Sequence, residues 1–105
     1  MGIILKFNTL SSFLKTSRHS LTPGPVALIF VEDDIEIRAT IAHHLMRGFR
    51  SILVFIPPGI AHPEGFASQV SCICYDTLGE GAVEYAINRI IRWNPDTWMY
   101  YCYNA

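Results

Sequence analysis

The sequence predicts an α/β fold built around a mainly parallel β-sheet, and three observations carry this prediction. Residues 26–31 form a continuous apolar run, and residues 51–56 and 70–75 are nearly as apolar, as is typical of strands covered on both faces in a parallel sheet. Two further stretches, 34–47 and 82–93, place apolar residues at the spacing of an amphipathic helix. Strands that alternate with helices in this way build parallel sheets.

The sequence also explains where the predicted elements begin and end. The first strand stops at the acidic run Glu32–Asp34, and the helix after it closes at Gly48, because glycine is common directly after a helix. Residues 57–69 contain several prolines and glycines, so we expect an irregular connection there. Gly81 precedes the second helix, whose apolar positions share one face.

Residues 97–103 predict a fourth strand, which carries no charged side chain. Strands of this composition usually lie centrally in a parallel sheet, under helices. Because the chain ends just after this strand, we interpret residues 25–105 as the N-terminal half of a larger α/β domain, truncated at its C-terminus. An uncovered strand of this kind also favours self-association.

Composition and charge exclude several classes of protein. The chain of 105 residues has 8 basic and 9 acidic side chains, which gives no electrostatic reason to expect a nucleic-acid partner. Half of the residues are hydrophobic, so disorder is excluded, yet no apolar run approaches the ~20 residues of a membrane helix. The odd number of cysteines and the lack of a secretory segment indicate a cytoplasmic protein. Residues 1–24 read as an N-terminal lead-in with room for one short helix.

Acidic residues follow two of the predicted strands. Glu32, Asp33 and Asp34 follow the first strand, and Asp76 follows the third. The carboxyl ends of parallel strands share one edge of the sheet, where ligands bind at a switch in strand order. These carboxylates could therefore accept hydrogen bonds from a ribose or a base, or hold a divalent cation. Local roles compete with binding, since Asp33 and Glu36 have the spacing of a capping box and Asp76 suits a turn.

The histidines and cysteines suggest packing rather than a metal site. His43 and His44 are adjacent in the predicted helix, so their side chains point about 100° apart and cannot share one ion. His44 falls on the apolar stripe beside Ile41, which predicts a buried, hydrogen-bonded imidazole, whereas His43 faces solvent. Cys72 and Cys74 share one face of a strand, and we interpret them as small buried side chains.

The stretch from Val31 to Phe49 resembles the opening of family 2 type glycosyltransferases with a GT-A fold. In the branch it resembles, the first strand ends in Asn-Glu, at the position of Glu32-Asp33 here. The following helix of that branch contains His-His-Leu, two further residues and Gly, as residues 43–48 do. The resemblance continues at Gly81–Asn88 and at Asp96–Trp98.

This resemblance implies that residues 25–105 form the nucleotide-sugar-binding half of a GT-A domain, which is a Rossmann-like three-layer arrangement with a mainly parallel sheet. The family transfers a sugar from a nucleotide donor to an acceptor, and an Asp-X-Asp motif after its fourth strand holds Mn²⁺ or Mg²⁺. Asn104 and Ala105 stand at that place here, so we expect the chain alone to be inactive. The implied nucleoside pocket is lined by Glu32, Asp33, Asp34 and Asp76.

The acidic opening from Val31 to Arg38 is also similar to that of phosphoacceptor receiver domains. Asp76 would then accept the phosphoryl group, with Mg²⁺ held by Asp33 or Asp34. Against this alternative, no second helix is predicted before the third strand, and Asn104 replaces the expected Ser or Thr. Our first hypothesis is therefore a glycosyltransferase-like protein, and the second is a receiver-like signalling domain.

Overall fold

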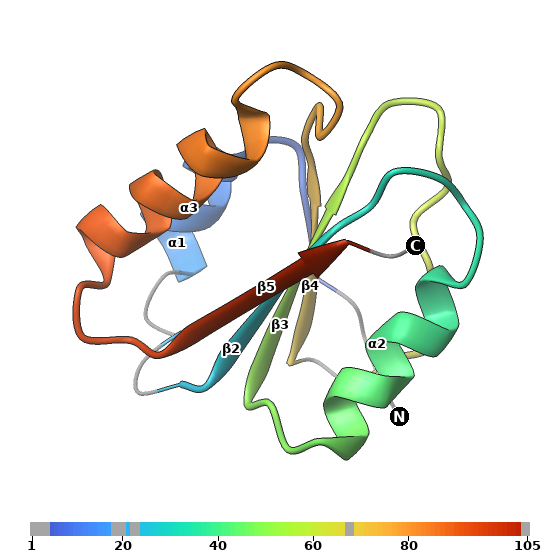
Figure 1. Ribbon diagram of the computed structural model, residues 1–105, viewed down its shortest axis with the longest axis horizontal. Helices are drawn as coiled ribbons and strands as arrows, with labels where there is room; N and C mark the ends of the chain where they lie inside the picture. Colours follow the sequence, from blue (N-terminus) through green and yellow to red (C-terminus); the bar gives the residue numbers. More distant parts are fainter. Residues whose placement is uncertain (1–4, 18–20, 22–23, 67–68, 104–105) are drawn as a thin grey trace.

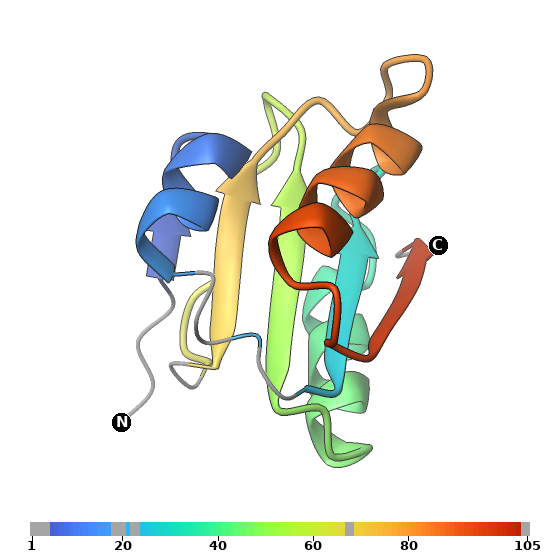
Figure 2. The ribbon, with the colours of Figure 1, turned by 90° about the vertical axis from the view of Figure 1, so that its left-hand side faces the viewer.

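The computed structural model describes residues 5–17, 21, 24–66 and 69–103. Its elements are β1 (Leu5–Phe7), α1 (Leu10–Ser17), β2 (Val26–Phe30), α2 (Ile37–Met46), β3 (Ser51–Ile56), β4 (Val70–Cys74), α3 (Ala82–Trp93) and β5 (Met99–Tyr103). The strands form one sheet in the order β1-β4-β3-β2-β5, and every neighbouring pair is parallel (Figure 2). The predicted α/β class is confirmed, and the sheet is compatible with a Rossmann-like fold.

Helices lie on both faces of this sheet, with α1 and α3 on one face and α2 on the other (Figure 1). Phe13 of α1 and Ile90 of α3 belong to one core cluster, and Ile41 of α2 belongs to the other. The connections β1–β2 and β4–β5 run along the sheet in one direction, whereas β2–β3 runs in the opposite direction. Crossovers in parallel sheets are right-handed, so opposite directions place the helices on opposite faces.

The two strands β2 and β3 are buried along their whole length. Both faces of each strand contact core side chains, which explains why their sequences do not alternate between apolar and polar residues. Phe30 and Phe55 are partners in the β2–β3 register, and their rings stack with centroids 4.6 Å apart. The predicted strands 26–31, 51–56 and 70–75 are confirmed to within one residue at their ends.

Helix α3 has the predicted bounds, but α2 begins at Ile37 rather than at residue 34. Glu36 is the N-cap residue and has a left-handed backbone, with φ 61°. Its side chain makes no capping hydrogen bond, so the predicted capping box is wrong. The Asp33 carboxylate instead accepts a hydrogen bond from the Ile35 N–H at 2.9 Å, which closes a turn ahead of the helix.

The described part of the N-terminal lead-in is integrated into the sheet and its core. Helix α1 agrees with the predicted short helix, and its side chains Phe13 and Leu14 are fully buried. Strand β1 was not predicted. It pairs with β4, with Lys6 opposite Cys72.

Strand β5 lies at an edge of the sheet and not centrally, as its composition had suggested. Helices cover it only in part, since the side chains of Tyr100, Tyr101 and Tyr103 are 54%, 52% and 44% exposed. The apolar character of this strand therefore does not reflect burial.

The connection between β3 and β4 is irregular in its described part, as predicted. Among the residues that the structure describes, no helix combines the length and the apolar character needed to cross a membrane.

Candidate functional site

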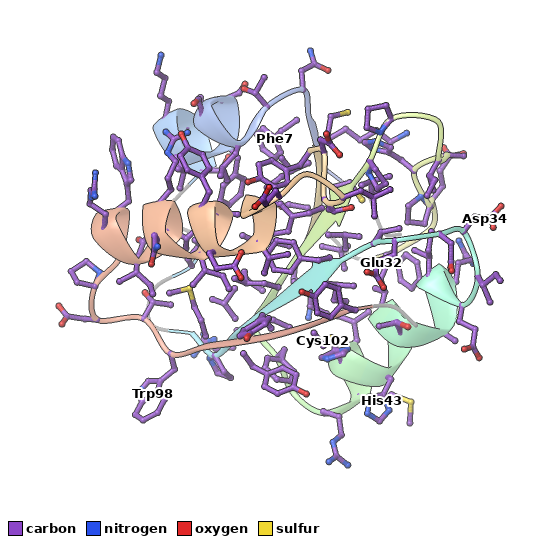
Figure 3. All side chains as sticks on the ribbon, turned by 45° about the horizontal axis from the view of Figure 1, so that its top comes forward. Phe7, Glu32, Asp34, His43, Trp98 and Cys102 are labelled. Atoms are coloured by element: carbon purple, nitrogen blue, oxygen red, sulfur yellow. The ribbon has the colours of Figure 1, made fainter. Side chains whose placement is uncertain are left out.

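The predicted acidic residues lie at the edge of the sheet where the parallel strands end. Glu32, Asp33 and Asp34 occupy the turn between β2 and α2, and all three are exposed. In Figure 3, Glu32 lies close to the end of the sheet, and Asp34 projects outward from the turn. Asp76 follows β4, which ends at the same edge because the sheet is parallel. We name this edge the carboxyl-end rim.

A buried hydrogen bond joins the two acidic turns across the intervening strand β3. The Thr77 hydroxyl donates to the Val31 carbonyl, and the two residues are 46 positions apart in the sequence. Thr77 is next to Asp76, and Val31 is next to Glu32. The structure thus places the four predicted site residues on one rim, as the sequence analysis required.

Two of these carboxylates also have structural roles in their turns. Asp33 accepts the hydrogen bond from Ile35 described above, and Asp76 Oδ1 accepts one from the Leu78 N–H at 3.2 Å. For Asp76 this is the turn role that competed with ligand binding in the sequence analysis, whereas for Asp33 the competing role was the capping box. A carboxylate has two oxygens with several lone pairs, so one turn bond does not use up its capacity to accept.

A pocket of about 540 Å³ opens on the rim between the β2–α2 turn and the loop after β3. Ligand pockets in proteins commonly measure roughly 300–1,000 Å³. Its charged or titratable lining residues are Asp34, Glu36, Arg38 and His62. Arg38 also holds the loop in place, because its guanidinium donates to the Glu64 carbonyl and lies 4.8 Å from the centre of the Phe66 ring.

The described residues do not supply a ready-made metal site. Within residues 5–17, 21, 24–66 and 69–103, no three His, Cys, Asp or Glu side chains are grouped closely enough to hold an ion. The acids on the rim therefore do not fit a bound divalent cation by themselves.

His44 is buried and hydrogen-bonded, as predicted, and His43 is exposed. His44 Nδ1 lies 2.8 Å from the Thr40 carbonyl oxygen, and because that oxygen can only accept, Nδ1 carries the proton. Nε2 then faces Cys102 Sγ at 3.7 Å, which links α2 to β5. We interpret this contact as packing between elements, since it lies away from the acidic turns.

The predicted burial of the cysteines holds for only one of the pair on β4. Cys72 is fully buried, and burial raises its pKa to about 12. Cys74 is exposed, so the prediction for this residue is wrong, because β4 loses its cover at its last residue. Cys74 Sγ lies 3.5 Å from Nε2 of His62. The sequence analysis missed His62, which lies in an irregular loop where no periodic pattern marks a side chain as functional.

Comparison of the chain with protein-family models, with curated proteins and with solved structures returns no match. The functional assignment therefore depends on the sequence pattern and on the geometry of the rim.

Proposed function

We propose that the chain is the nucleotide-sugar-binding half of a glycosyltransferase-like protein with a GT-A arrangement, and that its carboxyl-end rim binds the nucleotide. The observation that carries this proposal is the strand order. Counted from the strand that precedes the acidic turn, β2, β3, β4 and β5 lie in the order 3-2-1-4. Nucleotide-binding sheets of the Rossmann type begin with this order.

The same strand order favours the glycosyltransferase reading over the receiver-like one. Flavodoxin-like sheets, to which receiver domains belong, have the order 2-1-3-4-5, in which the third strand lies on the other side of the first. Here the third strand, β4, lies on the same side of β2 as the second strand, β3. The receiver-like alternative, with Asp76 as phosphoacceptor, has no comparable support.

The reversal in strand order falls between β2 and β5, and ligands of open α/β sheets bind at such a point. Glu32 is the first residue of the acidic turn on this side, and its carboxylate can accept hydrogen bonds from ribose hydroxyls or from a base N–H. The pocket between the β2–α2 turn and the loop after β3 opens on the same rim and offers space for the rest of the nucleotide. In this proposal the residues bind and orient the donor, and transfer of the sugar requires groups beyond them.

Two features of the proposal concern partners and location. The three cysteines are unpaired, which fits the reducing cytoplasm where we place the protein. Strand β5 leaves one backbone edge without a neighbouring strand among the described residues, and no charged side chain lies between Trp98 and Tyr103. Native edge strands usually carry charges or prolines that prevent pairing, so we propose that a second copy of the chain pairs with β5.

The binding proposal is tested by titrating the 105-residue chain with UDP-sugars and GDP-sugars while backbone amide signals are followed by NMR. We expect shifts in residues 31–37 and 75–78, and weaker binding by Glu32→Gln. Glu84→Gln is the matched control, because Glu84 lies in the first turn of α3 and is exposed. If no nucleotide sugar shifts the rim signals, the proposal is wrong. Addition of a phosphoryl group to Asp76 by a small phosphodonor would favour the receiver-like alternative.

A further inference from the structure

The thiol of Cys74 lies beside the imidazole of His62, a residue that also lines the pocket on the carboxyl-end rim. Cys74 is the last residue of β4, and its side chain is exposed. Its Sγ lies 3.5 Å from Nε2 of His62, within hydrogen-bonding distance for sulfur. A nucleophile within hydrogen-bond reach of a base is the minimal arrangement for activating a thiol.

We propose that Cys74 and His62 form a thiol–imidazole pair that reacts with small disulfides, so that Cys74 is a site of reversible S-thiolation.

The environment of His62 keeps its imidazole neutral, which is the form that can accept a proton. Its Nδ1 is buried and has no hydrogen-bond partner among the described residues, so no carbonyl or carboxylate stabilises the protonated ring from that side. Partial burial and the charge of Lys6 on β1 lower the pKa of His62, which keeps the imidazole neutral at neutral pH. A neutral ring with its proton on Nδ1 presents the Nε2 lone pair to the thiol.

The other two cysteines lack one part or another of this arrangement. Cys72 is buried, and its raised pKa of about 12 leaves almost no thiolate at neutral pH. Cys102 is half-buried, and burial raises its pKa. Its imidazole neighbour His44 is itself buried beneath β5. Of the three thiols, only Cys74 is exposed.

The reaction is a thiol–disulfide exchange and needs no oxidant beyond the disulfide itself. The Cys74 thiol gives its proton to Nε2 of His62 as Sγ attacks one sulfur of the disulfide. A bond forms between Sγ and that sulfur while the original S–S bond breaks, and the second sulfur leaves as a thiolate. That thiolate takes up the proton, so one thiol is consumed, one is released, and one disulfide remains.

Low-molecular-weight disulfides with an anionic group suit this site best. The charge of Lys6 acts on His62 and on Cys72, which is two residues before Cys74 on β4, so a cation lies in the neighbourhood of the thiol. Glutathione disulfide carries carboxylates and is small enough to reach an exposed strand end. We therefore use it as the probe.

The experiment treats the native chain with glutathione disulfide at pH 7 and locates the adducts by peptide mass mapping over time. We expect Cys74 to be modified first, at a rate about tenfold or more above that of N-acetylcysteine, since a positioned base commonly contributes at least that much. His62→Gln should lower the Cys74 rate toward that of the free thiol. His43→Gln is the matched control, because His43 is exposed and lies on α2.

Two results of the rate measurements would overturn the inference. One is modification of Cys102 before Cys74 in the native chain, which requires no variant and so does not depend on whether a variant folds. The other is a Cys74 rate equal to that of N-acetylcysteine. Reduction of the adduct by dithiothreitol should restore the original mass, and an adduct that persists would contradict reversible thiolation.

Discussion

The Thr77 hydroxyl donates a hydrogen bond to the Val31 carbonyl and so joins the turn after β4 to the end of β2. Strand β3 lies between these two strands, so the bond spans a neighbour in the sheet. Thr77 is buried, and water therefore cannot easily replace the hydroxyl. Through this contact the acidic residues that follow β2 and β4 belong to one rim.

Replacement of Thr77 by valine should lower the free energy of unfolding by about 1–3 kcal/mol. Valine has nearly the same shape, so the change removes the hydroxyl and leaves the buried Val31 carbonyl without this donor. Thr77→Ser keeps the hydroxyl and is the control. Urea denaturation followed by circular dichroism measures both variants, and equal stability of Thr77→Val and the unchanged chain would show that the bond does not contribute.

Glycine is required at position 24 for two reasons, but at position 59 for only one. Gly24 has φ +85°, and an added Cβ would lie 3.0 Å from the Trp98 carbonyl oxygen. Gly59 has φ +92°, but an added Cβ would meet nothing within 4 Å. We expect Gly59→Ala to cost about 1–2 kcal/mol for the left-handed backbone, and Gly24→Ala to cost more. Thermal unfolding of the two variants tests this order, which would be wrong if both melt together.

The strands and helices that the sequence predicted well are those whose local pattern reflects burial. The continuous apolar run at 26–31 and the helical spacing at 82–93 arise because β2 is covered on both faces and α3 on one. His44 could be placed in the core for the same reason, since its position on the helix relative to Ile41 decides its burial. Such features depend on residues close in sequence.

The features that could not be predicted depend on contacts between distant segments. β1 is only three residues long and shows no period, and its place beside β4 follows from the strand order. The aromatic strand β5 has the composition of a central strand but lies at the edge. Cys74 and His62 are 12 positions apart, and His62 lies in an irregular loop, so their contact leaves no spacing signature.

The protein should become less stable as pH falls through about 6.5, in part because of His62. Burial and the charge of Lys6 lower the pKa of this imidazole in the folded state below its ordinary value of 6.5. Between the folded-state and unfolded-state pKa of His62, the unfolded chain binds more protons than the folded chain, so acidification favours unfolding. Above 6.5 the imidazole is neutral in both states, and the stability reaches its full value.

The His62 contribution is isolated by comparing the unchanged chain with His62→Gln in urea denaturation at several pH values between 5 and 8. We expect the free energy of unfolding of the variant to depend less on pH over this interval. His43→Gln is the control, because His43 is exposed on α2. Identical pH profiles for the unchanged chain and His62→Gln would contradict the assignment.

The proposed pairing of β5 with a second copy should be abolished by Tyr101→Pro without loss of the fold. In a parallel strand, the N–H and C=O of one residue point to the same side, and those of the next residue point to the other side. The Trp98 carbonyl points to β2, where it accepts a hydrogen bond from the Val26 N–H at 2.9 Å. The N–H of Tyr101 therefore points away from β2, and proline removes a donor only from the free edge.

Tyr101→Thr keeps this donor while it also removes the aromatic ring. Light scattering after size-exclusion chromatography should give a dimer for the unchanged chain and for Tyr101→Thr, but a monomer for Tyr101→Pro. A monomer in all three cases would mean that β5 does not pair, and a dimer in all three would place the interface on another surface.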